Sequence, residues 1–205
     1  MNAKNHQLIA LDADGVLLDY NRAYGTAWQR AFGTQPALRD ANAYWAMDRW
    51  DVPRLDPVLR DQFRGAFDDE FWSTVPAIEG AVKACERLRA AGFDLVCVSA
   101  LKPQFADARL ANLRAHGFPI NRVVATSNDA VDASPKARAL TELQPIAFVD
   151  DYLPYFRGVP DNIHKALVMR EPNGTPNVGV GLESIRSQHA NLAAFADWWL
   201  DSRKT

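Results

Sequence analysis

The sequence predicts an α/β fold in which a doubly wound parallel sheet carries an inserted all-helical segment. Three observations lead to this prediction. Short apolar runs rich in Val and Ile recur along the chain, segments with helical spacing lie between them, and residues 19–78 interrupt the alternation with helical stretches alone. Strands that alternate with helices are typical of a doubly wound sheet, because each crossover helix returns the chain to a parallel strand.

Five apolar runs are predicted as strands. Three of them, "QLIAL" at 7–11, "FDLVCVS" at 93–99 and "IAFV" at 146–149, are continuous rather than alternating. A continuous pattern is typical of strands that are buried on both faces of a sheet. Two further runs, "RVVATS" at 122–127 and "KALVM" at 165–169, complete the predicted sheet.

Helical patterns connect these strands. "AVKACERLRAAG" and "QFADARLANLRAHG" end at Gly92 and Gly117, which suit helix C-caps, and "SPKARALTEL" begins with Ser134 as a candidate cap. The tail "ANLAAFADWWLDSRKT" reads as a last helix, with Trp198 and Trp199 expected to pack on the core. The alternatives for these two indoles are a contact with a ligand and a contact between the copies of a homodimer.

Composition argues against several classes of partner. The chain has 23 Lys and Arg against 25 Asp and Glu, so no positive field favours nucleic acid or an anionic membrane. No apolar stretch suits a signal peptide or a membrane span, and a cytoplasmic location is expected. Cys85 and Cys97 lie among apolar neighbours, and we expect both to be reduced core residues.

Polar side chains follow the predicted strands at their carboxyl ends, where open α/β sheets bind ligands. The set consists of Asp12, Asp14, Ser99, Asp150 and Asp151, with Lys136 at the start of a helix. Carboxylates gathered at one edge raise one another's pKa unless a cation neutralises them, and oxygen ligands favour Mg²⁺. The sequence therefore predicts a magnesium site with free carboxylates beside it.

Each of these residues also has an ordinary explanation. Ser99 can simply end a strand, Lys136 can be a solvated lysine, and Asp151 can cap a turn. A calcium loop is disfavoured, because its spacing needs an oxygen ligand at Val16 and a glycine at Leu17. The coincidence of all the polar groups at one sheet edge favours the functional interpretation.

Four short motifs in fixed order resemble those of the haloacid dehalogenase-like hydrolases. They are "DADG" at 12–15, Ser99 in "VCVSA", Lys136 in "SPKARAL" and the acid pair in "FVDD" at 148–151. The chain departs from the family in lacking "KPxP" around Lys136 and "GDxxxD" after Asp150. These departures weaken an assignment to the phosphoglycolate-phosphatase-like branch but remove no catalytic position.

The resemblance implies a role for each residue. Asp12 would be the nucleophile and Asp14 the general acid and base, while Ser99 and Lys136 would stabilise the phosphoryl group. Mg²⁺ would be held by Asp12, the backbone carbonyl of Asp14, Asp150 and Asp151. Family members that cleave carbon–halogen bonds do not keep the second acid, so Asp14 favours phosphoryl chemistry.

By this resemblance the chain is a phosphatase that acts on a small phosphorylated metabolite through an aspartyl-phosphate. The alternatives are a phosphomutase on the same scaffold and a non-catalytic phosphoacceptor or binding protein. The Rossmann-like core would span residues 1–18 and 79–205, and a helical cap would span 19–78 with hinges near 18–20 and 76–80.

The cap would select the substrate. We expect its aromatic residues to form mostly its own core; they are Tyr20, Tyr24, Trp28, Tyr44, Trp45, Trp50, Phe67, Phe71 and Trp72. One or two of Arg22, Arg39, Arg49 and Arg54 are expected to face the cleft and bind an anionic group of the substrate. Lys102 and Asn128 also follow strands and are candidate lining residues.

Overall fold

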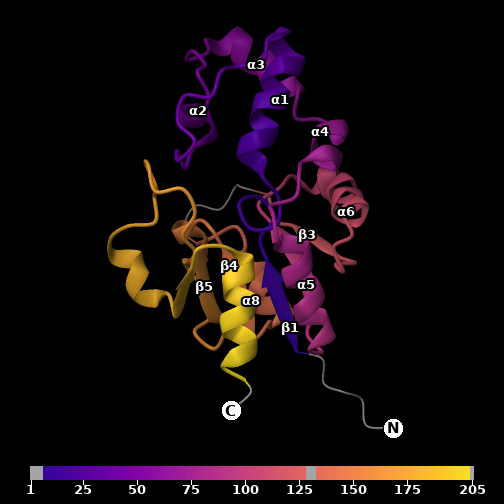
Figure 1. Cartoon of the computed structure of the whole chain (residues 1–205), viewed down its shortest axis with the longest axis vertical. Coiled ribbons are helices and arrows are strands. Elements are labelled where there is room, and N and C mark those ends of the chain that lie inside the picture. The colour runs from indigo at the N-terminus through magenta and orange to yellow at the C-terminus, as the bar shows by residue number, and fades with distance from the viewer. Residues whose placement is uncertain (1–6, 128–132, 204–205) are drawn as a thin grey trace.

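A six-stranded parallel sheet forms the centre of the protein (Figure 1). The computed structural model describes residues 7–127 and 133–203. The strands are β1 (Leu8–Leu11), β2 (Asp94–Ser99), β3 (Val123–Ala125), β4 (Ala147–Asp150), β5 (His164–Val168) and β6 (Ser187–His189), in the order β3-β2-β1-β4-β5-β6. The chain winds outward on both sides of β1 and β4, so the switch point that binds ligands in such sheets lies between these two strands.

The predicted α/β class and parallel sheet are confirmed, and all five predicted runs form strands. The sixth strand, β6, was not predicted. Its residues Ser187–His189 read "SQH" and are partly exposed, because the strand pairs only with β5 at the edge of the sheet. An edge strand of three polar residues gives no apolar signal in the sequence.

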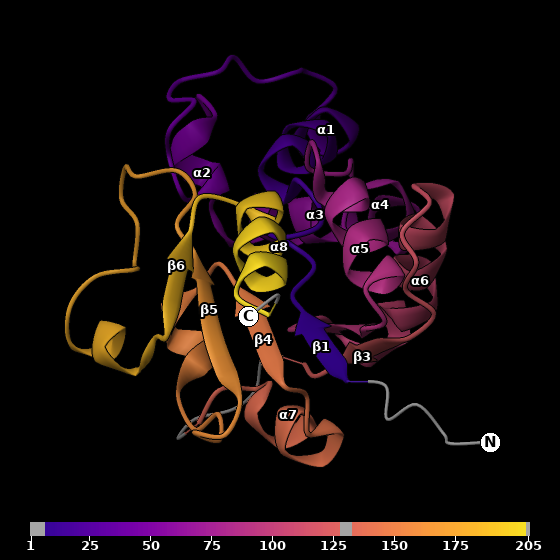
Figure 2. The same cartoon turned by 60° about the horizontal axis from the view of Figure 1, so that its bottom comes forward.

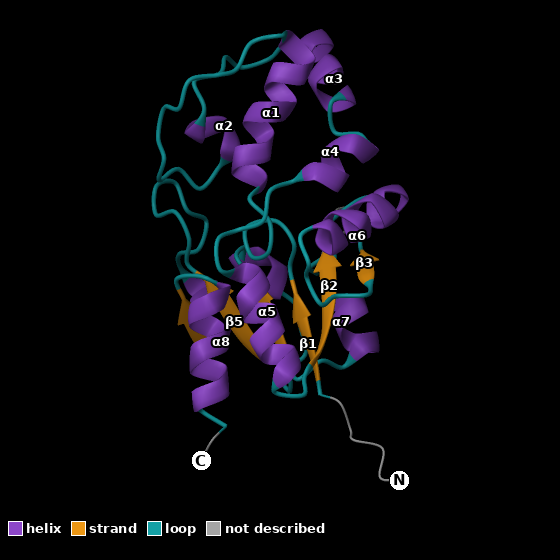
Figure 3. Cartoon of the chain, turned by 45° about the vertical axis from the view of Figure 1, so that its right-hand side comes forward, coloured by secondary structure: helices purple, strands orange, loops and turns teal. Residues whose placement is uncertain are grey.

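Helices cover both faces of the sheet (Figures 2 and 3). They are α5 (Ala81–Ala90), α6 (Ala106–Ala115), α7 (Ala137–Leu143) and α8 (Leu192–Asp201). Alternate residues of β1 belong to two separate cores: Ile9 and Leu11 share one with Leu88 of α5, and Ala10 shares the other with Leu140 of α7. The continuous apolar pattern of β1 therefore reflects burial on both sides.

The segment between β1 and α5 lies over the carboxyl ends of the strands (Figures 1 and 3). It contains α1 (Tyr20–Phe32), α2 (Ala46–Arg49), α3 (Pro57–Gly65) and α4 (Asp69–Thr74). The chain enters and leaves it through a narrow neck, where Leu18 and Ala77 form an antiparallel bridge and Asp19 N–H donates to Pro76 O at 2.8 Å. The division into a core and a cap at residues 18–20 and 76–80 stays a prediction, and so does the action of this neck as a hinge.

Most aromatic residues of this segment pack against one another, as predicted. Phe67 contacts Phe71 with ring centroids 4.7 Å apart, and Tyr20 contacts Phe71 at 6.0 Å. The prediction is wrong for Tyr44 and Trp45, whose rings pair with each other, while Trp45 also pairs with Tyr152, which follows β4. They are carried by the loop before α2, away from the α1, α3 and α4 cluster.

The last helix, α8, follows the sequence prediction only in part. Trp199 is buried against the sheet, but 41% of Trp198 is exposed, so the expectation that both indoles pack on the core is wrong for Trp198. Consecutive helical residues project about 100° apart, so Trp198 does not share the buried direction of Trp199, and its ring lies 5.3 Å from the partly exposed His164. Among the described helices, α8 included, none is long and apolar enough to cross a bilayer.

The two cysteines are free and buried, as expected. Cys97 lies on β2 and Cys85 on α5, both within the core on the same face of the sheet. Burial raises the pKa of the Cys97 thiol to about 12, so this thiol is protonated at neutral pH. A buried, protonated thiol behaves as a small apolar side chain.

Candidate active site

Asp12 directly follows β1 at the middle of the sheet's carboxyl edge. Its backbone N–H donates to Val149 O of β4 at 2.9 Å, which fixes the residue between the two central strands. The carboxylate accepts a hydrogen bond from the Ala13 N–H at 2.7 Å and lies 2.7 Å from Lys136 Nζ. Burial raises the pKa of Asp12 well above its ordinary value, and the Lys136 charge opposes that shift. The ionised form therefore depends on nearby cations.

Lys136 connects Asp12 to a second buried carboxylate. The lysine immediately precedes α7, its side chain is fully buried, and its Nζ lies 2.6 Å from Asp150 Oδ2. Burial disfavours the ammonium, but Asp12 and Asp150 outweigh it and raise the pKa of Lys136. Burial also raises the pKa of Asp150 to about 6, against the effect of Lys136. Two carboxylates thus share one ammonium group.

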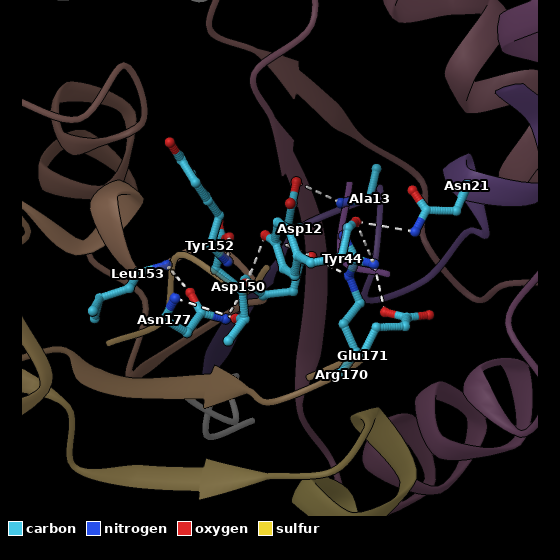
Figure 4. Close-up of polar contacts among 12 residues, drawn as sticks. Asp12, Ala13, Asn21, Tyr44, Asp150, Tyr152, Leu153, Arg170, Glu171 and Asn177 are labelled. Carbon is cyan, nitrogen blue, oxygen red and sulfur yellow. Dashed lines mark hydrogen bonds and ion pairs between the residues drawn. The ribbon is translucent and has the colours of Figure 1, made fainter. Parts of the chain in front are cut away.

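Asp151 brings a third carboxylate to the same place as Asp12 and Asp150. Figure 4 shows Asp12 and Asp150 together with Tyr44 and Arg170. Its Oδ2 forms an ion pair with Arg170 Nε and accepts a hydrogen bond from the Tyr44 hydroxyl at 3.2 Å. Burial raises the pKa of Tyr44, so this hydroxyl keeps the proton that it donates. Arg170 follows β5 and Tyr44 belongs to the inserted segment, so both parts of the chain hold Asp151.

The three carboxylates fit a divalent metal ion. Oxygen atoms of Asp12, Asp150 and Asp151 lie within 4.8 Å of one another, and all three residues are buried. Only two cations contact these carboxylates among the described residues, Lys136 and Arg170. An all-oxygen donor set with excess negative charge is what Mg²⁺ prefers.

Asp14 lies apart from that cluster and has its own cation. Its carboxylate oxygens are 2.8 and 3.0 Å from Nη2 of Arg109, a fully buried side chain on α6. The carboxylate of Asp14 is not in the metal-binding group, so the predicted contribution of Asp14 to the metal is confined to its backbone carbonyl. Burial raises the pKa of Asp14, with Arg109 opposing, and a raised pKa suits a proton donor.

Gly15 makes the approach of these groups possible. Its φ is +88°, and a Cβ at this position would lie 2.5 Å from Asp151 Cγ and 2.7 Å from Arg170 Nε. We expect Gly15→Ala to displace Asp151 and to lower the free energy of unfolding by about 1–3 kcal/mol beyond the backbone strain itself.

The matched control for this substitution is Gly33→Ala. Gly33 has a similar φ of +74°, and no atom lies within 4 Å of the place that its Cβ would occupy. Alanine there costs only the left-handed conformation, about 1–2 kcal/mol. Urea denaturation of both variants measures the difference. Equal losses in the two variants would contradict the close contact at Gly15.

A cavity of about 430 Å³ opens onto these residues. Its lining includes Asp12, Asp14, Ser99 and Asp151, so four of the predicted site residues share one space. Ser99 is buried at the end of β2, the neighbour of β1 in the sheet. The predicted meeting of strand ends thus places a hydroxyl and three carboxylates around a single small cavity.

The other predicted lining residues that the structure describes lie elsewhere. Lys102 is exposed and does not line this cavity, and Asn128 falls outside the described residues. The predicted arginines of the inserted segment do not line it either. Arg39 pairs with Asp51, Arg49 with Glu171, Arg22 lines a neighbouring cavity, and Arg54 is exposed.

Two arginines of the core, Arg109 and Arg170, contact the acidic residues of the site, whereas the arginines predicted from the inserted segment do not line its cavity. Sequence reasoning missed both core arginines. Arg170 is the first residue after the run "KALVM", so the strand-end rule that applies to the aspartates applies to it too. Arg109 lies one turn into α6, the helix that follows β2, and has no strand-end signal. Only the packing of α6 beside Asp14 shows which face of that helix meets the site.

The sequence profile of the haloacid dehalogenase-like hydrolases matches residues 6–153, a stretch that contains every predicted site residue. The chain belongs to this family. Like the resemblance drawn from its motifs, the match identifies a haloacid dehalogenase-like hydrolase. A search of curated proteins by sequence found no match.

Solved structures of haloacid dehalogenase-like hydrolases share this fold. A family member from Deinococcus radiodurans with bound phosphate and sodium is 18% identical, with a TM-score of 0.63 over 98% of this chain and 97% of that one. A predicted phosphoglycolate phosphatase from Haemophilus somnus is 14% identical, with a TM-score of 0.62 over 95% and 98%. An L-2-haloacid dehalogenase is 13% identical, with a TM-score of 0.56 over 95% and 100%. The structural similarity extends to both phosphatases and dehalogenases, so it shows the fold of this chain. It does not distinguish between the two reactions, which must be argued from the residues of the site.

Proposed function

We propose that this chain is a Mg²⁺-dependent phosphomonoester hydrolase that works through an aspartyl-phosphate on Asp12. The observation that carries the proposal is the convergence of the Asp12, Asp150 and Asp151 carboxylates within 4.8 Å, with Lys136 bridging two of them. Bound Mg²⁺ would neutralise the charge of these carboxylates and of the incoming phosphate. Asp12 and Asp150, together with Asp151 and the backbone carbonyl of Asp14, would hold the ion.

The side chains of the site divide the reaction between them. A carboxylate oxygen of Asp12 attacks phosphorus, and the bond from phosphorus to the leaving oxygen breaks. Asp14 gives its proton to that oxygen and later takes a proton from the water that attacks the aspartyl-phosphate. Lys136 and the Ser99 hydroxyl stabilise the negative charge of the phosphoryl oxygens. The products are an alcohol and inorganic phosphate, with Asp12 restored.

The second acid favours phosphoryl transfer over dehalogenation. A halide leaves as a stable anion and needs no proton, whereas an alkoxide leaving group does. Asp14 is 28% exposed in its side chain, lines the cavity beside Asp12 and has a raised pKa. This placement supports a proton donor to a leaving oxygen.

The test compares two reactions in one preparation. Phosphate release from a panel of phosphomonoesters and halide release from 2-chloropropionate are each measured with Mg²⁺ and with EDTA. We expect phosphate release that requires Mg²⁺ and no halide release. Mg²⁺ is also expected to raise the thermal unfolding midpoint of the native chain, because an ion that binds only the folded state stabilises it, and to raise that of Asp151→Asn much less.

Several outcomes would contradict the proposal. Halide release that persists in EDTA would make the protein a dehalogenase. Transfer of the phosphoryl group to a second hydroxyl of a sugar phosphate, without free phosphate, would make it a mutase. A rise in the unfolding midpoint with substrate but no product of any kind would make it a binding protein.

A further inference from the structure

The cavity above the acid cluster has an unusually aromatic wall. Six of its lining residues are aromatic: Tyr20, Tyr44, Trp45, Trp72, Tyr152 and Tyr155. Tyr20 and Trp72 also pack in the aromatic cluster of the inserted segment, with Phe67 and Phe71. The other four do not belong to that cluster, so packing of the inserted segment does not explain them.

These four rings form a continuous series, here called the ring wall. Tyr155 contacts Tyr152 at 4.7 Å between ring centroids, Tyr152 contacts Trp45 at 6.0 Å, and Trp45 contacts Tyr44 at 5.0 Å. All three pairs are close to perpendicular, which is a favourable geometry for aromatic pairs. The four side chains of the ring wall therefore pack in a defined arrangement.

The ring wall leads from the reacting groups to solvent. The ring of Tyr155 lies 4.5 Å from Lys136 Nζ, beside the lysine that bridges Asp12 and Asp150. Farther along the series, 43% of Trp45 is exposed. A series of rings that lines a cavity from its reacting groups to its opening is typical of a small-molecule binding site.

Contacts from the core and from α1 fix the backbone next to Trp45. The backbone N–H of the preceding Tyr44 donates to Asn173 O at 2.9 Å, and the Asn21 side chain donates to Tyr44 O at 3.1 Å. Arg170 stacks over the Tyr44 ring at 4.1 Å. Trp45 is thus presented by a fixed backbone, which lowers the entropy cost of binding against it.

Charge limits what the leaving group can be. Arg170 is the one cationic side chain among the described residues that line the cavity, and it already pairs with Asp151 and Glu171. A second phosphate or a carboxylate on the leaving group would lie against the carboxylates of the site, which repel it, and against uncharged rings, which do not neutralise it. The volume of about 430 Å³ lies near the lower end of the range for ligand pockets, enough for a phosphate and a small ring system.

We infer that the substrate is a phosphomonoester whose alcohol carries a neutral aromatic ring, which stacks on the ring wall while its phosphate reaches Asp12. This inference rests on the proposed phosphatase function. Two sources supply such chemistry, a nucleoside 5′-monophosphate and a simpler arylalkyl phosphate. Both present a flat ring within reach of a phosphate ester.

The test compares esters that differ in aromaticity but have similar leaving alcohols. Benzyl phosphate is compared with cyclohexylmethyl phosphate, and adenosine 5′-monophosphate with ribose 5-phosphate. We expect kcat/KM to favour the aromatic member of at least one pair by roughly tenfold, because stacking on an aromatic wall contributes beyond apolar area alone. The pair that shows the preference identifies the source of the ring.

Substitutions connect the preference to the ring wall. The preference is expressed as the ratio of kcat/KM for the aromatic ester to kcat/KM for its non-aromatic partner. Trp45→Ala is expected to bring this ratio close to one by raising KM for the aromatic ester, and Trp45→Phe is expected to keep most of the preference. Trp198→Ala is the matched control, since Trp198 is similarly exposed at 41% but lies on α8, and its ratio should equal that of the native chain.

Two results would overturn the inference while the phosphatase function stands. One is hydrolysis of both pairs without an aromatic preference. The other is a preference that survives unchanged in both Trp45→Ala and Tyr152→Ala. Absence of hydrolysis for every phosphomonoester would instead remove the proposed function itself.

Discussion

Turnover of a phosphomonoester is expected to fall by about four orders of magnitude or more when Asp12 is replaced with asparagine. Asparagine has nearly the same shape, but its amide is not a nucleophile and cannot form the acyl-phosphate. The variant also loses the carboxylate that pairs with Lys136 at 2.7 Å, although Lys136 keeps Asp150 at 2.6 Å. Initial rates of phosphate release at saturating substrate and Mg²⁺ measure the effect.

Asp48→Asn serves as the control for the Asp12 variant. Asp48 is an exposed residue of α2 and is expected to tolerate the same change without loss of rate. Circular dichroism and the unfolding midpoint establish that both variants are folded. A folded Asp12→Asn protein with a rate near that of the native chain would contradict covalent catalysis by this residue.

Lys136→Met is expected to lower the free energy of unfolding by about 3–5 kcal/mol when no divalent cation is added. The substitution keeps the length of the side chain but leaves the buried carboxylates of Asp12 and Asp150 without their shared ammonium. The same loss removes the positive charge beside the phosphoryl group, so turnover is expected to fall by about two to three orders of magnitude. Urea denaturation in EDTA measures the stability, and phosphate release measures the rate.

The loss of stability in Lys136→Met is expected to become smaller at low pH. Lys136 lowers the pKa of Asp150 in the native chain, where it is about 6, so the pKa rises further without it. A folded-state pKa above that of the unfolded chain means that stability is greatest at low pH and is lost as pH rises through the folded pKa. The stability difference between variant and native chain should therefore shrink as the pH falls toward about 6 and change little below it.

A second buried lysine provides the control. Lys165 is also buried, but its partner Asp161 has a side chain that is 96% exposed, so Lys165→Met leaves a carboxylate that water can solvate. We expect a loss of about 1 kcal/mol or less from that ion pair. Similar losses in the two lysine variants would mean that the pairing of Asp12 and Asp150 is not what Lys136 contributes.

The sequence was sufficient to predict five of the six strands and the acids at the edge of the sheet. Strands buried on both faces, such as Leu8–Leu11 and Ala147–Asp150, leave continuous apolar runs, and the polar residue after each run must lie at the carboxyl edge. That rule alone is enough to locate Asp12 and Asp150. It extends equally to Arg170, which follows the run "KALVM".

Side chains brought to the site by helices and loops could not be predicted in the same way. Arg109 reaches Asp14 from the face of α6, and Tyr44 reaches Asp151 from an irregular loop of the inserted segment. Their positions depend on how these segments pack on the sheet, and no local spacing encodes that packing. The edge strand Ser187–His189 was missed because it has only one partner strand and little apolar surface to bury.

The central claim is that Asp12 carries the phosphoryl group during turnover, and trapping that intermediate tests it most directly. The native chain is mixed with substrate and Mg²⁺, quenched in acid during the first turnovers, digested and analysed by mass spectrometry. We predict one added phosphoryl group on the peptide that contains Asp12, and none on the same peptide of Asp12→Asn. Continued phosphate release with no phosphoryl group on Asp12, or with the group on another residue, would contradict the account.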